Sequence, residues 1–405
     1  MRLLILGHSY VVDRNCATLR ALAGLDSEIL GGKNPGSEMK VRLLVPSSWP
    51  AGGIRGRRLR PTALRDEGFQ RIPTATLGAP NQSALLYGPR MLRELRRFRP
   101  DVVQVEYGAK SLALAQVLVL RRLLRGRFRV VFFTWANVPY ALRWPLRQLE
   151  RFNLDGSDAA IVGNAAAGEI LRDHGFRGPL LERPLMGVDP KPVPEATRRS
   201  WRERLGLDPA LPTLVFAGRL HRQKGIDLLL TALDSLEDVP WQILLAVRGP
   251  ELERVERWRE ASPVGKRLKW LGAVEPEAMA GLLSTADVLV LPSRSDAKFR
   301  TLTTRGWQEQ FGMVLVEAMA QGVTVAASRS GAIPDVVEDA GLLFPPDAPA
   351  ELAQALRRLL GDAALRRELA MRGRERVRNC YSTEAVARQH AAFLRQLLAA
   401  AGDLC

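Results

Sequence analysis

The stretch TLVFAGRLHRQKGIDLLLTAL (213–233) joins a strand pattern to a helix pattern through a short loop. Its first residues form an apolar run, and the chain can turn at Gly218. After Gly225, isoleucine and leucines recur at the three- and four-residue spacing of an amphipathic helix. A strand, a turn and a helix in this order are the repeating unit of an α/β protein.

The same alternation continues along most of the chain, so the sequence predicts an α/β protein with parallel sheets. Predicted strands cover residues 2–7, 41–47, 102–107, 130–135, 159–164, 213–220, 242–249, 268–274, 287–293 and 323–328. Predicted helices cover residues 88–98, 111–125, 165–174, 225–235, 275–285, 312–321 and 349–360. The region 48–80, rich in Pro, Gly and Arg, is expected to form long loops or irregular strands.

The length of 405 residues exceeds what one hydrophobic core usually supports, which predicts two domains. The proline-rich segment RPLMGVDPKPVPEA (183–196) is typical of a linker. We therefore expect Rossmann-like domains at 1–187 and 188–385, with a C-terminal helix at about 386–405 packing back onto the first. Ligands of such folds bind at the carboxyl ends of the strands, so a cleft between two facing domains is expected there.

The net charge of +16 is concentrated in the first half of the chain. Residues 1–190 hold 29 Lys and Arg against 16 Asp and Glu, whereas the remainder holds 30 against 27. Basic clusters occur at 55–61, 92–100 and 121–129. They indicate either attraction to an anionic partner, such as lipid headgroups, nucleic acid or a phosphorylated substrate, or simply a solvated arginine-rich surface.

The spacing of the cysteines and the lengths of the apolar runs indicate in which cellular compartment the chain is expected. The three cysteines are far apart and outside any metal-ligand spacing, which favours a reducing environment. The apolar run SLALAQVLVL (111–120) is about half the length that a membrane span needs. The chain is therefore expected in the cytoplasm, without a metal, and its basic face is expected to allow peripheral contact with the inner face of the membrane.

The loop after the first strand of the second half carries two cations, Arg219 and Lys224. They lie where a phosphate group would approach a strand-to-helix turn. A second turn, Phe311-Gly312 in WQEQFGMVLVEAMAQGV (307–323), begins an apolar helix, whose free N–H groups also favour an anion. Together these loops predict a diphosphate site.

Two carboxylates bracket the second turn. Glu309 precedes the helix, and Glu317 lies within its apolar run. An ionised carboxylate inside such a helix needs a polar partner. Hydroxyl groups of a sugar and of a ribose on either side of a diphosphate would supply such partners. The alternative is that the glutamates cap the helix or form salt bridges.

The pattern Glu309-x7-Glu317 resembles the motif of retaining glycosyltransferases of the GT-B fold, family 4, the glycosyl transferases group 1. The resemblance is close over about residues 150–385 and looser before them. Its ordered motifs are VFAGRL…KG, WLGAV, ADVLVLPS, EQFGMVLVEAMAQGV and SGAIPDVVEDAGLLFPPD, with ERFNLDGSDAAIVGNAAAGEIL and PLMGVDP between the halves.

The resemblance implies a sugar transferred from a nucleotide sugar to an acceptor, with retention and without a metal. Arg219 and Lys224 would hold the diphosphate, Glu309 would contact the transferred sugar, and Glu317 would bind the ribose. The leaving phosphate oxygen would help to deprotonate the acceptor, with Glu309, Arg219 and Lys224 as the catalytic set. The implied donor-binding residues are Gly218, Arg219, Lys224, Ala273, Val274, Glu309, Phe311, Gly312, Met313 and Glu317.

The N-terminal half departs from the family at several points. The histidine that often follows a first-domain strand is absent from TWANVP (134–139), where Asn137 takes its place. His8, after the first strand, and Asn137 are the candidates for the acceptor or sugar side. The first glycine-rich loop is replaced by GHSYVVDRN, with a weak glycine signal at 29–36, and the loop 294–306 is longer than usual.

The sequence thus predicts a hexosyltransferase-type enzyme whose acceptor is a glycan, a lipid or a small molecule. The basic first half favours a lipid-linked acceptor, as in envelope polysaccharide or glycolipid synthesis. The alternatives are a GT-B nucleotide-sugar epimerase, a phosphorylase or an inactive nucleotide-binding protein. No nucleic-acid-binding motif accompanies the positive charge, so a nucleic-acid partner is not expected.

Overall fold

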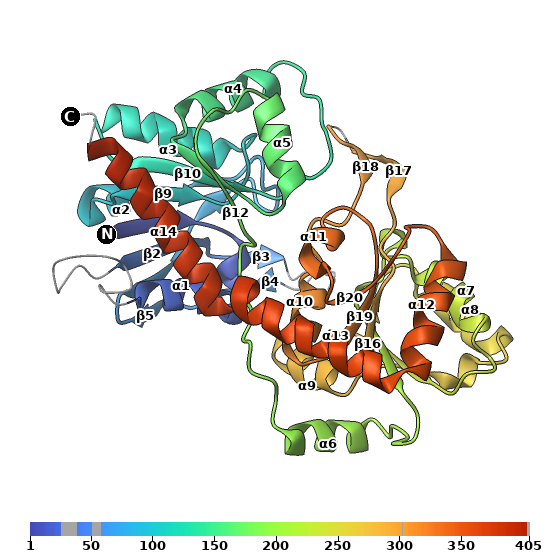
Figure 1. Ribbon diagram of the computed structural model, residues 1–405. Coiled ribbons are helices and arrows are strands. Elements are labelled where there is room, and N and C mark those ends of the chain that lie inside the picture. The colour runs from blue at the N-terminus through green and yellow to red at the C-terminus, as the bar shows by residue number, and fades with distance from the viewer. Residues whose placement is uncertain (26–38, 51–57, 302, 403–405) are drawn as a thin grey trace. The chain divides into compact units, whose positions relative to one another are not determined.

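The computed structural model describes residues 1–25, 39–50, 58–301 and 303–402 (Figure 1). The chain divides into two compact units, which are described separately. Unit 1 comprises Met1–Gly187 together with Thr383–Cys405, and unit 2 comprises Val188–Ser382. The glycine signal at 29–36 and the first residues of the basic cluster at 55–61 lie outside the described residues.

Unit 1 is built on an eight-stranded sheet in the order β12-β11-β10-β9-β1-β2-β6-β5. Every pairing is parallel except that of β5 with β6. The strands are β1 (Arg2–Leu6), β2 (Lys40–Pro46), β5 (Leu64–Asp66), β6 (Phe69–Thr74), β9 (Val102–Val105), β10 (Arg129–Thr134), β11 (Ala159–Val162) and β12 (Leu180–Glu182). Short antiparallel pairs join β3 (Trp49–Pro50) to β4 (Arg58–Leu59) and β7 (Thr76–Leu77) to β8 (Leu86–Tyr87).

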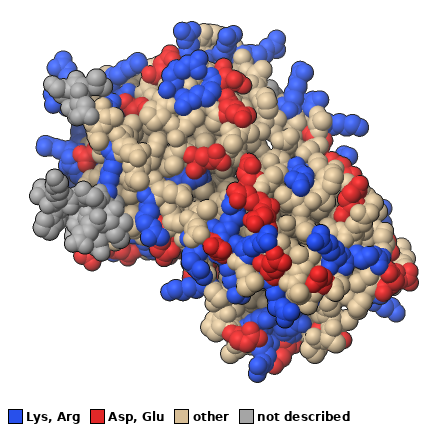
Figure 2. Space-filling model, viewed as in Figure 1, with Lys and Arg blue, Asp and Glu red and all other residues tan. Residues whose placement is uncertain are grey.

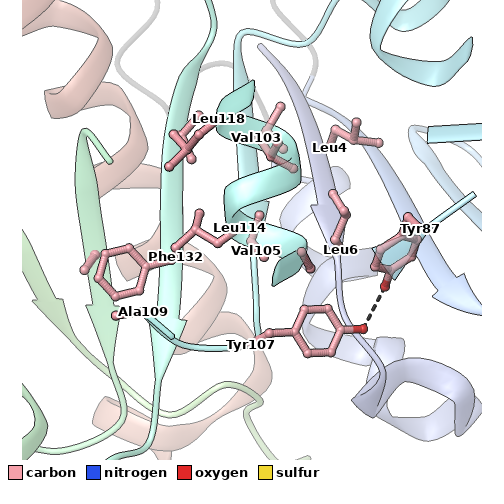
Figure 3. Packing of buried hydrophobic residues seen from close by; sticks show 14 of the residues in the cluster. Leu4, Leu6, Tyr87, Val103, Val105, Tyr107, Ala109, Leu114, Leu118 and Phe132 are labelled. Carbon is pink, nitrogen blue, oxygen red and sulfur yellow. Dashed lines mark hydrogen bonds between the residues drawn. The ribbon is translucent and has the colours of Figure 1, made fainter. Parts of the chain in front are cut away.

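Helices cover both faces of this sheet, which is why its central strands are apolar at nearly every position. Leu4 and Leu6 of β1 join the buried cluster on one face, shown in Figure 3, and Leu3 and Ile5 join the cluster on the other. The first cluster is covered by α2 (Arg90–Phe98), α3 (Leu112–Leu123), α4 (Leu146–Gly156) and α5 (Ala165–Asp173). The second is covered by α1 (Ala17–Ala23) and α14 (Thr383–Gly402).

Unit 2 contains a six-stranded, entirely parallel sheet in the order β15-β14-β13-β16-β19-β20. Its strands are β13 (Thr213–Arg219), β14 (Gln242–Arg248), β15 (Leu268–Trp270), β16 (Val288–Leu291), β19 (Thr324–Ser328) and β20 (Gly341–Phe344). An antiparallel hairpin of β17 (Asp296–Arg300) and β18 (Arg305–Trp307) follows β16. The helices are α6 (Glu195–Arg204), α7 (Ile226–Asp234), α8 (Leu252–Ala261), α9 (Met279–Ser284), α10 (Met313–Ala320), α11 (Ile333–Val337), α12 (Pro349–Gly361) and α13 (Ala363–Arg376).

The expected α/β architecture with two parallel sheets is confirmed. The patterns missed several helices, among them α1, α4, α6, α8 and α13. The reason is clearest for α6, which has no buried residue and therefore no apolar stripe. Part of the region 48–80 is also more regular than expected, because residues 69–74 pair with β2 over their whole length.

Candidate active site

A glycine turn at Gly225 places the start of α7 close to the loop that follows β16. Gly225 has a left-handed backbone, and a β-carbon there would lie 2.0 Å from the carbonyl oxygen of Pro292. The loop before α7 and the loop after β16 are also joined by a hydrogen bond from the Arg294 N–H to the Gln223 carbonyl, at 2.8 Å. Glycine is required at 225 because any side chain would push these two loops apart.

This close approach brings Lys224 and Glu309 together. The Lys224 ammonium group forms an ion pair with Glu309 Oε2, and the Ser293 hydroxyl donates to the same oxygen at 2.7 Å. The side chains of Lys224 and Glu309 are only 17% and 9% exposed. The structure thus joins two residues that the sequence placed in one site, although they are separated by 85 positions.

The backbone of Glu309 is held as firmly as its carboxylate. Its N–H donates to the Ser330 hydroxyl at 3.3 Å, and its carbonyl accepts from the Ala332 N–H at 3.0 Å. The Ser330 hydroxyl in turn donates to the Arg294 carbonyl at 2.6 Å. Ser293 and Ser330 were not predicted as site residues, although each follows closely on a buried strand.

Arg219 lies at the last position of β13, next to Arg248 at the last position of β14. Both side chains are exposed, and neither forms a hydrogen bond or ion pair with another described residue. Gly218 before Arg219 has φ of +145°, and a β-carbon there would meet nothing within 4 Å. Two unpaired guanidinium groups at neighbouring strand ends favour an anionic ligand. Arg248 is a cation that the sequence reading did not include.

The loop 294–306 contains most of the β17–β18 hairpin, and the hairpin ends at Trp307. The Lys224 ammonium group lies 5.6 Å from the centre of the Trp307 ring. At this distance the face of an indole ring attracts a cation. Trp307 therefore belongs to the surroundings of Lys224, and nothing in the sequence spacing pointed to it.

The second glycine turn starts α10. Gly312 has φ of +82° and precedes Met313, the first residue of the helix, which no side chain caps. Phe311 is buried and packs edge-on against Tyr381, with ring centres 5.5 Å apart. Burial raises the pKa of Tyr381 to about 12. Glu317 is half-buried on α10, and its predicted contact with a ribose remains a prediction.

The loop after β15 holds the two residues expected near the nucleobase. Ala273 is exposed and Val274 is half-buried. Gly272 before them has a left-handed backbone with φ of +73°. Their backbone groups therefore follow a tight turn at the carboxyl end of a strand, where ligands of α/β sheets bind.

In unit 1, the candidates His8 and Asn137 follow β1 and β10, which lie on either side of β9 in the sheet. The His8 ring stacks near Trp49 and Tyr107, with centroid distances of 4.6 and 5.4 Å. Burial lowers the pKa of His8 to about 4, so its imidazole is neutral at physiological pH. Its Nε2 lies 2.9 Å from the Gln82 amide nitrogen.

A buried carboxylate, Glu106, also lies at this end of the unit 1 sheet, directly after β9. Its Oε1 accepts from the Tyr10 hydroxyl at 2.8 Å and from the Gln104 amide at 2.9 Å. Its Oε2 has no hydrogen-bond partner among the described residues. Burial raises the pKa of Glu106 to about 7. The sequence reading treated VVQVEY (102–107) only as a strand and missed this group.

The described part of the chain contains no group of three or more His, Cys, Asp and Glu side chains that could hold a metal ion. Within the same residues, every helix is too short or too polar to cross a membrane.

Comparisons with known proteins bear on the family and the fold of the chain. Residues 197–376 match the family of glycosyl transferases group 1, and residues 7–182 match the glycosyl transferase 4-like domain. Among solved structures, sucrose-phosphate synthase from Thermosynechococcus elongatus superposes with a TM-score of 0.70 at 23% identity, covering 99% of this chain and 100% of that one. The Anabaena protein HepE in complex with UDP-glucose has a TM-score of 0.67 at 16% identity, covering 98% and 100%. These likenesses confirm the GT-B fold.

Sequence relatives extend the comparison. The sulfoquinovosyl transferase SQD2 of Arabidopsis thaliana is 26% identical over 349 residues, covering 82% of this chain and 61% of that protein. The D-inositol 3-phosphate glycosyltransferase of Corynebacterium jeikeium is 35% identical over 182 residues, covering 42% and 40%. The chain thus spans less than two thirds of the length of these two proteins.

A relative from Mycobacterium tuberculosis, a GDP-mannose-dependent alpha-(1-6)-phosphatidylinositol monomannoside mannosyltransferase, is matched over more of its length. It is 30% identical over 332 residues, covering 77% of this chain and 81% of that protein. Both halves of the chain also match their counterparts in the family. The chain therefore belongs to the glycosyl transferases group 1.

Proposed function

We propose that this protein transfers a sugar from a nucleoside diphosphate sugar to an acceptor, with retention of configuration at the anomeric carbon. The observation that carries the proposal is the buried Lys224–Glu309 pair, close to the uncapped N-terminus of α10. A lysine ammonium group has three donors, and Glu309 takes one of them. The remaining donors are available to phosphate oxygens, with Arg219 as the second cation.

The chemistry follows from where charge develops. As the bond between the sugar and the diphosphate breaks, negative charge grows on the leaving phosphate oxygen. Arg219, Lys224 and the N-terminal N–H groups of α10 would stabilise that charge. The departing oxygen would accept the proton of the acceptor hydroxyl as that hydroxyl attacks the same face of the sugar. Glu309 would orient Lys224 and accept a hydrogen bond from a sugar hydroxyl.

A nucleotide panel tests the donor part of the proposal. UDP, GDP, ADP, dTDP and CDP are compared by thermal shift on wild type, on Glu317→Ala and on Glu256→Ala. Glu256 is an exposed residue of α8 whose side chain forms no hydrogen bond or ion pair with a described residue, so it controls for loss of a charge. A ligand at about 100 times its Kd stabilises the folded state by about 2.7 kcal/mol. One nucleotide should stabilise wild type and Glu256→Ala but not Glu317→Ala.

Two results would contradict the donor assignment. If no nucleotide raises the melting temperature of the wild type, unit 2 is not a nucleoside diphosphate site. If Glu317→Ala responds like the wild type, the ribose role of Glu317 is wrong even though the nucleotide binds. Product analysis with the identified donor then separates transfer from epimerisation and phosphorolysis.

The acceptor is proposed to be anionic and lipid-linked. In unit 1, a cavity of about 450 Å³ is lined by Arg2, Arg96, Arg99 and Arg127. Of these, Arg2 is paired with Asp101. Nearby on α3, the side chain of Leu123 is 74% exposed. Figure 2 shows Lys and Arg side chains projecting from the periphery of this unit. Guanidinium groups beside exposed apolar side chains are suited to lipid headgroups.

Vesicle sedimentation tests the lipid contact. The wild type should bind vesicles containing phosphatidylglycerol at low salt, and this binding should weaken as the salt concentration rises. It should not bind neutral vesicles. The triple variant Arg96→Gln, Arg99→Gln, Arg127→Gln should lose most of this binding, while Arg259→Gln, an exposed arginine of α8, should not. The proposal for this surface would be overturned if the wild type did not bind these vesicles. It would also be overturned if the triple variant bound them as strongly as the wild type.

A further inference from the structure

A cavity in unit 2 lies at the opposite end of the sheet from Lys224 and Glu309. It has a volume of about 540 Å³, within the range of small-molecule sites. Asp287 and Thr324, at the amino ends of β16 and β19, line it, whereas Glu309 and Lys224 lie beyond the carboxyl ends. Because β19 has five residues, the two ends are about 17 Å apart. The cavity is therefore separate from the donor site.

Helix α13 supplies one wall with alternating small and cationic side chains. Ala363, Arg366, Arg367, Ala370 and Arg374 line the cavity at the three- and four-residue spacing of one helix face. The two alanines leave room between the guanidinium groups. A fourth arginine, Arg198 of α6, also lines the cavity.

The acidic residues of the cavity do not balance these four arginines. Glu195 is 3.6 Å from Arg198, and Asp287 Oδ2 accepts the Thr213 N–H at 2.7 Å. Arg366 donates to the Leu359 and Leu360 carbonyls at the end of α12. The side chains of Arg367 and Arg374 have no hydrogen bond or ion pair with any described residue.

Two further observations concern the guanidinium donors among the residues that line this space. Arg198 Nε is buried and has no hydrogen-bond partner among the described residues. The Arg374 guanidinium lies so close to Gly322 that a β-carbon there would be 2.1 Å from its Nη2. The amide oxygen of Gln321, which also lines the cavity, already accepts the Val193 N–H at 2.9 Å. A buried donor without a partner is costly, and an anion would remove that cost.

We propose that this cavity, which we term the arginine cavity, binds a phosphate-bearing ligand at a site distinct from the donor site. Arg367 and Arg374 would hold the phosphate oxygens, and Arg198 would complete the site from α6. Paired guanidinium donors match the oxygens of a phosphate monoester or diphosphate. The same chemistry is found in a free phosphorylated compound and in a phospholipid headgroup.

The test uses pyrophosphate as the probe at constant ionic strength, with calorimetric titration of the full chain. All proteins carry Arg219→Gln, which weakens any binding at the donor site. Arg219→Gln should bind pyrophosphate saturably, and adding Arg367→Gln with Arg374→Gln should weaken that binding by about tenfold or more. Adding Arg259→Gln instead should leave it unchanged. None of these exposed arginines forms a side-chain hydrogen bond with a described residue, so the variants should fold.

Each result decides the matter. Absence of saturable binding to Arg219→Gln, or equal binding by the Arg367→Gln, Arg374→Gln protein, would overturn the proposal. Vesicles containing phosphatidic acid identify the source of the phosphate. Sedimentation that depends on Arg367 and Arg374 points to a headgroup, whereas binding of pyrophosphate alone points to a soluble ligand. The nucleotide panel is unaffected by these outcomes, so failure here leaves the proposed transferase reaction standing.

Discussion

At the scale of single residues, the pair formed by Lys224 and Glu309 combines burial with opposite charge. With side chains 17% and 9% exposed, each ion has lost most of its hydration and depends on the other. Ser293 supplies a further donor to the carboxylate. Removing one member therefore leaves the other with an uncompensated charge in a poorly solvated place.

Glu309→Gln should lower sugar transfer by about a hundredfold or more, because the neutral amide no longer orients Lys224 towards the phosphate. Binding of the nucleoside diphosphate should change much less, since both cations remain. Steady-state kinetics with the identified donor, together with nucleotide titration, measures both effects. Ser293→Ala, which removes one hydrogen bond to the same oxygen, should lower the rate of sugar transfer by about tenfold. Turnover of Glu309→Gln near the wild-type level would exclude Glu309 from the reaction.

Glu106 predicts a pH dependence of stability in unit 1. Its pKa is raised to about 7 by burial, from an ordinary value of 4.5. Below pH 4.5 Glu106 is protonated in both the folded and the unfolded chain, so it does not lower the free energy of unfolding. Between pH 4.5 and 7 the unfolded chain loses its proton first, so stability falls as pH rises. One pKa unit corresponds to about 1.4 kcal/mol, which limits the loss to about 3 kcal/mol.

Glu106→Gln should remove this slope, because an amide does not titrate and can still accept from Tyr10 and Gln104. Urea unfolding at pH 5 and pH 8 checks the expectation. The variant should gain stability relative to wild type at pH 8 and little or none at pH 5. His8, whose lowered pKa acts in the opposite direction as pH falls below 6.5, is common to both proteins and cancels in the difference. An identical slope in both proteins would rule Glu106 out as its origin.

At the scale of elements, the turn before α10 determines where the helix N-terminus lies. A β-carbon at Gly312 would come 2.8 Å from Leu315 Cδ1, and the φ of +82° is unfavourable for other residues. Gly312→Ala should therefore lower the free energy of unfolding by about 1–2 kcal/mol and weaken nucleotide binding. Urea unfolding and nucleotide titration give the two measurements.

Gly361→Ala is the matched control for this prediction. Gly361 ends α12, and a β-carbon there would meet nothing within 4 Å. Its replacement should be neutral or stabilise the protein by up to about 1 kcal/mol. Equal stability losses in the two variants would mean that the Gly312 turn has no special requirement for glycine.

At the scale of the whole molecule, the last helix belongs to the unit that the first strand begins. Helix α14 packs Ala387, Ala391 and Leu394 into the same cluster as Leu3 and Ile5 of β1. His390 Nε2 lies 2.7 Å from the Gln104 amide oxygen, across 286 positions of the sequence. The stability of unit 1 therefore depends on residues close to the end of the chain.

Leu394→Ala should destabilise unit 1 by about 2–4 kcal/mol, because Leu394 is fully buried and its loss leaves a cavity. Leu123→Ala, at a leucine that is 74% exposed, should change stability by less than about 0.5 kcal/mol. Urea unfolding monitored by circular dichroism compares the two. Nucleotide binding by unit 2 should survive the Leu394 change, and an unaltered unfolding curve would show that α14 does not support the core.

The amino-acid sequence by itself determined the α/β class and the central strands, because strands buried on both faces must be apolar along their length. It also located the glycine turn at 312 and the charged residues Lys224 and Glu309. Polar helices such as α6 were not predicted from the sequence, because they have no apolar stripe that a pattern could reveal. Only the tertiary structure decided which groups meet. Ser293 and Ser330 hold Glu309, and His390 reaches Gln104, through contacts between residues far apart in sequence, for which no local pattern exists.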